Sequence, residues 1–171
     1  MLIMKIVSMA TQDKLNDLVS FTFKQNSIAD NAVYFLEFKK LENIAEILHH
    51  TYAHAFGTLA DEITDFAKTQ DIRIYRKGFS GDTKDFEDLT EVFGELLERF
   101  EEYQELILEA IEVAENNGDI DVKSFLEDYS LRMGKYYNQL RIWVVKAEQY
   151  GNNYGPFEAS FSSFVHLPII D

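Results

Sequence analysis

The sequence predicts an all-α protein, a bundle of four long helices with one long connection between the second helix and the third. Glycine and proline are scarce, with 8 and 2 copies in 171 residues, so few turns and long elements are expected. Apolar residues recur at helical spacing in four segments, which is typical of helices that bury one face. A hydrophobic content of 46% and an aromatic content of 14% are typical of a packed globule. This length suits one hydrophobic core, so residues 1–171 are predicted to be a single domain.

The first helix is predicted over about residues 12–37, where apolar side chains repeat at helical spacing. Thr11 or Asp13 is the expected N-cap, because a side-chain oxygen there can accept a hydrogen bond from the first turn. No glycine or proline separates this helix from the next one. The pair Lys39-Lys40 is the expected junction between them.

The second helix is predicted over about residues 41–69, and its two faces differ in chemistry. At about 100° per residue, one broad stripe is apolar and should be buried in the bundle. It consists of Leu41, Ile44, Ala45, Leu48, Tyr52, Ala55, Phe56, Leu59, Ile63 and Phe66. An arc nearly opposite carries side chains that can bind metal ions. They are Glu46, His50, His54, Asp61 and Asp65.

A long surface connection is predicted over residues 70–84, which contain several basic residues and two glycines. Within it, the alternating stretch 72–75 is expected to be extended. The third helix is predicted over about 84–116, with Asp82 or Thr83 as its N-cap. Its second face is acidic and is predicted to be solvent-exposed. The acids are Glu91, Glu95, Glu98, Glu101, Glu102, Glu105, Glu109 and Glu112.

The fourth helix is predicted over about 120–149, after an Asn-Asn-Gly stop at 116–118. The C-terminal tail, 151–171, is too apolar to be free in solvent and is expected to dock on its own bundle or on a neighbour. His166 in this tail is expected to be packed or hydrogen-bonded and not a metal ligand. Two long helices, a crossover and two more long helices form the ferritin-like topology.

The composition narrows the classes of function. The chain has no cysteine, which excludes disulfides and thiolate metal sites. The net charge of −14 disfavours contact with bare nucleic acid. No window approaches the roughly 20 apolar residues of a membrane helix, so no membrane partner is expected. The N-terminal extension, 1–10, is a poor signal peptide and is left open as a strand-like arm, a frayed end or a helical extension. The expected location is the cytoplasm.

Three segments resemble the Dps (DNA-protection-during-starvation) branch of the ferritin-like superfamily, over about residues 12–150. The second helix ends in DEITD at 61–65, where the family has an Asp-Glu-Ile-x-Glu type of pattern. The corner EAIEVAENNGDIDVKSFLED at 109–128 resembles the family's acidic turn. The fourth helix closes with Trp143 followed four residues later by Ala147, as in the family.

The resemblance implies a hollow homo-oligomer, a dodecamer built from twofold dimers, that oxidises ferrous iron with peroxide and stores it. The family's ferroxidase ligands lie at the twofold interface, two histidines from one subunit and two acids from its mate. The acids correspond to Asp61 and Asp65 of this sequence. The histidine positions fall on Tyr34 and Glu46, so the usual ligand set is altered.

Histidines elsewhere on the second helix offer a substitute for the missing nitrogen ligands. His50 and His54 follow Glu46 by one and two turns on the same arc, so they could supply nitrogen to a rearranged site. Glu46 and His49 also form an E-x-x-H pair, the motif of carboxylate-bridged di-iron bundles. Such centres need a second copy on another helix, and the fourth helix has none.

Two further features of the family have partial counterparts. Asp119 and Asp128 match the acids that line an iron-entry pore, whereas Ser124 stands where a third acid is expected. DNA binding in the family often uses a lysine-rich terminus. The first thirty residues here have only three lysines, and none follows Lys146, so DNA binding stays open with little ionic support.

Two hypotheses about function remain. In the first, the protein is an iron-sequestering cage with a ferroxidase activity that protects against oxidative damage, with iron, or another divalent ion such as zinc or manganese, at the donors named above. In the second, it is a non-catalytic shell that acts by shielding or by binding another macromolecule.

Overall fold

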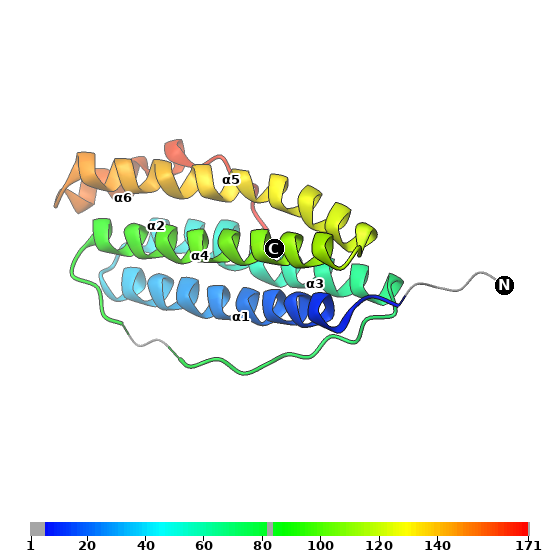
Figure 1. Ribbon diagram of the computed structural model, residues 1–171. Helices are drawn as coiled ribbons and strands as arrows, with labels where there is room; N and C mark the ends of the chain where they lie inside the picture. The colour runs from blue at the N-terminus through cyan, green and yellow to red at the C-terminus, as the bar shows by residue number, and fades with distance from the viewer. Residues whose placement is uncertain (1–5, 82–83, 171) are drawn as a thin grey trace.

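The computed structural model describes residues 6–81 and 84–170, and it is an antiparallel helical bundle with one connection running along its whole length (Figure 1). Two helices before this connection and two after it form the bundle, and the tail folds back over one side. The elements are α1 (Met9–Phe38), α2 (Glu42–Leu48), the π-helix η1 (His49–Ala53), α3 (Ala55–Thr69), α4 (Leu89–Asn116), α5 (Ile120–Tyr150), α6 (Tyr154–Ser160) and the 3-10 helix η2 (Phe161–Phe164). The predicted all-α bundle with a long crossover is confirmed.

Helix α1 begins earlier than predicted, because Ser8 is its N-cap in place of Thr11 or Asp13. The Ser8 side chain accepts a hydrogen bond from the Thr11 amide, so one of the free first-turn donors is satisfied. The helix ends at the predicted Lys39-Lys40 junction. There Lys40 has φ 64°, a left-handed conformation that reverses the chain after a helix.

The predicted second helix is interrupted by a π-bulge. Its apolar stripe is buried as expected, and only Phe66 remains partly exposed. Between α2 and α3 the amide of His54 bonds to the carbonyl of His49, five residues back, at 3.1 Å. An α-helix would use the carbonyl four residues back, so the bulge shifts the phase of α3 by one residue.

Helix α4 begins at Leu89, later than the predicted residue 84. Its N-cap is Asp88, whose side chain accepts the Glu91 amide at 2.8 Å. The N-caps predicted from the sequence, Asp82 and Thr83, lie outside the described residues. The chain from 84 to 88 therefore belongs to the connection.

The long connection is attached to α1 by hydrogen bonds from α1 side chains. The buried Asn16 donates to the carbonyl of Arg73 at 3.3 Å and accepts the amide of Tyr75. Ser20 accepts the amide of Lys77 at 3.0 Å. The stretch 72–75 has no regular secondary structure, and these side chains satisfy part of its backbone.

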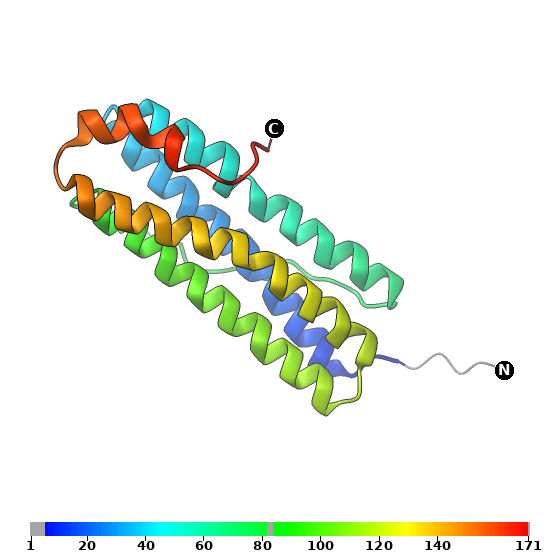
Figure 2. The ribbon, with the colours of Figure 1, turned by 90° about the horizontal axis from the view of Figure 1, so that it is seen from above.

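The tail docks on its own bundle, in agreement with the first of the two predicted alternatives. Phe157 and Phe161 of α6 and η2 are completely buried. The carboxylate of Glu158 accepts the amides of Asn43 and Ile44, which are first-turn donors of α2. Figure 2 shows α6 and the end of the chain lying against α2.

Aromatic rings fill the interior between the four long helices. The largest of them, including Trp143, Tyr52 and Tyr103, are inaccessible to solvent. Tyr103 and Tyr129 share a hydrogen bond between their hydroxyls. Burial raises the pKa of both groups, so they remain neutral phenols.

In the part of the chain that the structure describes, no helix is both long and apolar enough to cross a membrane.

Candidate functional site

The interior of the bundle does not fit a carboxylate-bridged di-iron centre. Such a centre takes inward-pointing Glu residues and Glu-x-x-His pairs from facing helices. Within the described ranges, the buried acids are Glu95 and Asp119, and no histidine is buried. Tyr52, Phe100 and Tyr136 pack against one another in the core, with ring centroids 6.1–6.5 Å apart. The histidines and acids of the second helix that the sequence suggested as metal ligands are therefore not part of a centre inside the core.

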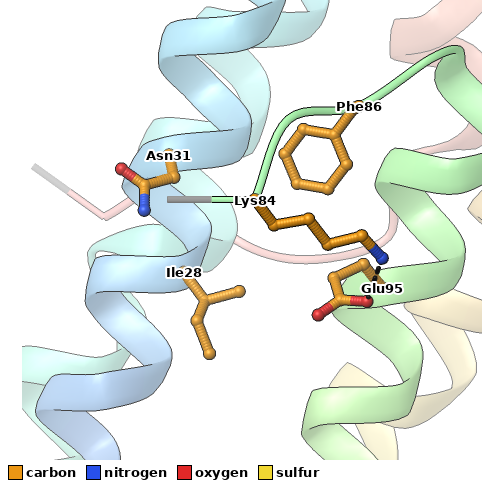
Figure 3. A pocket seen from close by; sticks show the side chains of 5 residues that line it. All are labelled: Ile28, Asn31, Lys84, Phe86 and Glu95. Carbon is orange, nitrogen blue, oxygen red and sulfur yellow. Dashed lines mark hydrogen bonds and ion pairs between the residues drawn. The ribbon is translucent and has the colours of Figure 1, made fainter. Parts of the chain in front are cut away.

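Glu95 was expected to be exposed with the other acids of its helix, and this prediction is wrong. Only 5% of its side chain is accessible, because Lys84 of the connection and Arg99 of α4 cover it. Lys84 Nζ lies 3.0 Å and Arg99 Nε lies 2.8 Å from its carboxylate. Figure 3 shows Lys84 and Phe86 packed between α1 and α4. Burial alone would raise the pKa of Glu95, but the hydrogen bonds from the two cations hold that pKa below its usual value.

The π-bulge gathers three histidines on one side of the second helix. The ring centroids of His49 and His54 are 4.1 Å apart, and those of His50 lie 5.0 and 5.2 Å from them. His49 and His54 are five residues apart, which is about 140° around a regular α-helix. They meet because five residues complete about one turn of the bulge.

Asp30 of α1 faces this histidine cluster from the neighbouring helix. Its Oδ1 lies 3.9 Å from Nδ1 of His49, too far for a hydrogen bond. Burial and the two neighbouring imidazoles lower the pKa of His49, although Asp30 opposes this. Burial raises the pKa of Asp30, and His49 and His54 reduce that rise. The neutral imidazole is therefore the favoured form of His49 at neutral pH.

The end of the tail closes the other side of the cluster. The amide of Ile170 donates to the carbonyl of His50 at 2.7 Å. In a regular α-helix this carbonyl would bond to the amide of His54, which the bulge has redirected to His49. The carbonyl of Ile170 in turn lies 3.2 Å from Nδ1 of His54.

An open groove of about 660 Å³ lies beside the histidines, between α1 and α2. Tyr34, Glu46 and His50, three of the residues that the sequence indicated, line it together with His49. Tyr34 has 61% of its surface exposed. The structure thus brings the altered ligand positions and one of the substitute histidines to a single surface.

Asp61 and Asp65 lie elsewhere, on the exposed side of α3. Fifteen residues of helix separate Glu46 from Asp61, which is about 22 Å along the axis. Asp65 pairs with Lys68 at 3.0 Å on the surface. One chain therefore does not bring these acids to the groove. Among the described residues, no group of three or more histidine or acidic side chains is placed so that it could hold a metal ion within one chain.

Asp119 and Asp128, which the sequence analysis matched to the acids that line an iron-entry pore, occupy different environments. Asp119 is buried, with 4% of its surface exposed, and its carboxylate accepts hydrogen bonds from Ser8 and Thr11. It therefore holds the start of α1 against the corner between α4 and α5. Asp128 is exposed and pairs with Arg132 at 3.1 Å, and Ser124 is exposed on the same helix. His166 has an exposed side chain, while its amide bonds to Gln139.

Sequence reasoning did not assign His49 and Asp30 to a site. With a uniform helical period, His49 and His54 would lie on different sides of the helix, and no pattern in the sequence predicts the bulge. The one available signal was the density of histidine, three of the chain's 4 copies within six residues.

Comparison with solved structures identifies the fold. The chain superimposes on the apo-ferritin from Pseudo-nitzschia multiseries with a TM-score of 0.83 and 16% identity, over 89% of this chain and 98% of that one. Two variants of PmFTN soaked in iron give TM-scores of 0.83 and 0.82 with 16% and 17% identity, over 89% of this chain and 98% of each of theirs. No protein-family model matches the chain, and no curated protein matches its sequence significantly. The protein therefore has a ferritin-like fold.

Proposed function

We propose that this protein sequesters iron, and that it binds iron between subunits and not inside its helical bundle. The observation that carries the proposal is the distribution of donors. Among the residues that the structure describes, the core holds no cluster of carboxylates or imidazoles, whereas Glu46, His50, Asp61 and Asp65 are all on the outer side of the second helix. The fold shared with iron-soaked ferritin structures supports iron as the metal.

The proposed site forms when two copies of the chain meet about a twofold axis. In such a pair, the groove with Tyr34 and Glu46 of one subunit faces Asp61 and Asp65 of the other, because a twofold contact presents the same surface from both sides. Exposed apolar side chains beside the groove support an interface there. Tyr34 and Phe38, one turn apart on α1, are 61% and 77% exposed.

In this site the carboxylates and an imidazole bind ferrous iron, the substrate, through oxygen and nitrogen. Peroxide takes one electron from each of two ferrous ions and leaves as two hydroxides, and the ferric product is stored in the shell. Removing both reactants limits oxidative damage. We propose the dodecamer of the Dps proteins as the shell, since the resemblance covers the same acids.

The second candidate is a shell without a catalytic centre, and the residue Tyr34 favours it. A phenol is a poor replacement for an imidazole at ferrous iron, so the site has fewer strong ligands than usual. A version of this shell that coats DNA has less support. Lys14 is engaged by Glu109 at 3.2 Å, and the chain's net charge is −14.

One experiment separates the two candidates. Ferrous iron is added anaerobically to the purified protein, peroxide follows, and the ferric absorbance is recorded. We expect faster oxidation than in buffer and a loss of most of that rate in the double variant Asp61→Ala/Asp65→Ala. The control is Asp13→Ala/Glu148→Ala, which removes two exposed acids elsewhere. A rate equal to that in buffer would eliminate the catalytic candidate and leave the shell.

A further inference from the structure

Residues 165–170 at the end of the tail, which we call the strap, form no regular helix and lie along the second helix (Figure 2). The strap begins at a firm attachment, because the buried side chain of Gln139 on α5 accepts the amide of His166. The residues that follow differ in burial. Leu167 is 7% exposed and packs on the bundle, whereas Ile169 is 75% exposed.

The far end of the strap is attached to the π-bulge. The amide of Ile170 donates to the carbonyl of His50 at 2.7 Å. The carbonyl of Ile170 lies 3.2 Å from Nδ1 of His54, and a carbonyl oxygen only accepts, so the imidazole is the donor of this bond. A helix carbonyl that has lost its usual amide needs another donor. The strap therefore supplies a donor that the bulge has taken away from His50.

Two side chains support the bulge in the same way. The hydroxyl of Thr51 donates to the carbonyl of Ile47 at 2.7 Å, and the side-chain amide of Asn26 donates to the carbonyl of Ala53 at 2.9 Å. Thr51 belongs to the bulge and Asn26 to α1, so neither donor leaves with the tail. Ile170 is thus a donor that can be withdrawn while the long helices remain in place.

We propose that the strap opens and closes on the folded bundle, and that in its closed position it holds the π-bulge and covers one side of α2. Opening breaks the two contacts of Ile170 and exposes Leu167, while Gln139 keeps the start of the strap in place. One buried side chain and two hydrogen bonds are set against the conformational entropy that the strap regains. Local opening should therefore need much less free energy than unfolding of the bundle.

The strap also forms one wall of a groove of about 500 Å³ beside α2. Glu46 and His50 line both this groove and the groove of about 660 Å³ between α1 and α2, so they form the ridge between the two. Opening the strap joins the two grooves into one surface around this ridge. The proposed pairing of subunits uses the same ridge, so an effect of the strap on pairing rests on the proposed function, whereas the opening itself does not.

Amide hydrogen exchange of the full-length protein, followed by mass spectrometry of its peptides, tests the proposal. In the wild type, the strap should exchange much faster than α4 and α5. Ile170→Pro removes the amide donor, and it should speed exchange at residues 49–55 by roughly five- to thirtyfold, the effect of one lost hydrogen bond. Leu167→Ala removes the buried side chain and should act in the same direction. Ile169→Ala is the matched control, because it changes an exposed residue of the strap.

The amides of α4 and α5 show in the same samples that each variant is folded, and they should exchange at the wild-type rate. The proposal would be overturned by a wild-type strap as protected as α5, by unchanged exchange of the bulge in folded Ile170→Pro, or by an equal increase in Ile169→Ala. An increase spread evenly over α4 and α5 in both Ile170→Pro and Leu167→Ala would also overturn it, because the tail would then only add to overall stability.

A second readout measures access to the ridge. Diethyl pyrocarbonate modifies accessible imidazoles, and the exposed His166 serves as the internal reference. Modification of His50 relative to His166 should rise in Ile170→Pro and Leu167→Ala and stay at the wild-type value in Ile169→Ala. An unchanged ratio in all three variants would mean that the strap does not cover this side of α2. Because no iron is present in either experiment, their outcome is independent of the iron oxidation test.

Discussion

Glu95 shows how one side chain can differ from its neighbours of the same type. Within α4 it is the buried acid, and of the two cations that cover it, Lys84 comes from the connection and Arg99 from its own helix. Its carboxylate has left water but gained two charged hydrogen bonds, and such a pair stabilises a fold only if both partners stay in place. The ion pair between Lys84 and Glu95 thereby joins the connection to α4.

We expect Glu95→Gln to lower the free energy of unfolding by about 1–3 kcal/mol at neutral pH, because the cations lose their anionic partner. The pKa of Glu95 in the folded protein is below the ordinary 4.5, so its contribution is complete above about pH 4.5 and is lost as the pH falls further. The difference between wild type and variant should therefore shrink in acid. Urea denaturation at several pH values measures it.

The control for this measurement is Glu98→Gln, which changes an exposed acid on the same helix. It should alter the stability by less than about 0.5 kcal/mol. An equal effect of the two substitutions, or a difference that grows as the pH falls, would contradict the role assigned to Glu95.

At the scale of the elements, the backbone of the connection forms hydrogen bonds with side chains of α1, in place of the backbone hydrogen bonds that a neighbouring strand would provide. Asn16 satisfies backbone groups on both sides of Ile74, and Ser20 satisfies one further along. A segment held by a few side-chain hydrogen bonds opens more easily than a helix. Its stability should then depend on single residues of α1.

We expect Asn16→Ala to expose the connection while the bundle remains folded. Losing its hydrogen bonds costs about 1–2 kcal/mol, which favours local opening by roughly five- to thirtyfold. Trypsin should cut after Arg73, Arg76 or Lys77 correspondingly faster. The variant Asp13→Ala, which changes an exposed residue on the same helix, should be cut by trypsin at the wild-type rate. Unchanged proteolysis of Asn16→Ala would mean that other contacts hold the connection.

The elements also show what the sequence could and could not predict. Regular periodicity placed the four long helices and the apolar stripe of the second helix, and the pair Lys39-Lys40 placed the end of α1, because each of these features depends on side chains close in sequence. The bulge at His49–Ala53 was not predictable from a period that assumes uniform helix. The burial of Glu95 and the approach of Asp30 to His49 depend on neighbours far along the chain, which a single sequence does not reveal.

At the scale of the whole molecule, the net charge of −14 sets the conditions for the proposed assembly. Copies that carry this charge repel one another, and salt screens the repulsion over a Debye length that falls from about 10 Å at 0.1 M to about 3 Å at 1 M. The proposed apolar contact at Tyr34 and Phe38 is not weakened by salt. Assembly should therefore increase with ionic strength.

Size-exclusion chromatography coupled to light scattering tests this expectation. The monomer has a mass of 19.9 kDa, so a dimer and a larger shell are readily distinguished from it. We expect the fraction of large species to rise between low and high salt, and to fall in Phe38→Ser. A fraction that falls as salt is added would mean that ion pairs, and not the apolar contact, hold the subunits together.

The aromatic interior gives the protein an optical reporter of the bulge. Trp143 is the chain's single tryptophan, and it is completely buried. Tyr52 belongs to the bulge itself, and its ring centroid lies 6.5 Å from that of Trp143. A change in the backbone of the bulge should therefore move the ring of Tyr52 relative to the indole of Trp143. The wavelength and intensity of tryptophan fluorescence should then report that change without an added label.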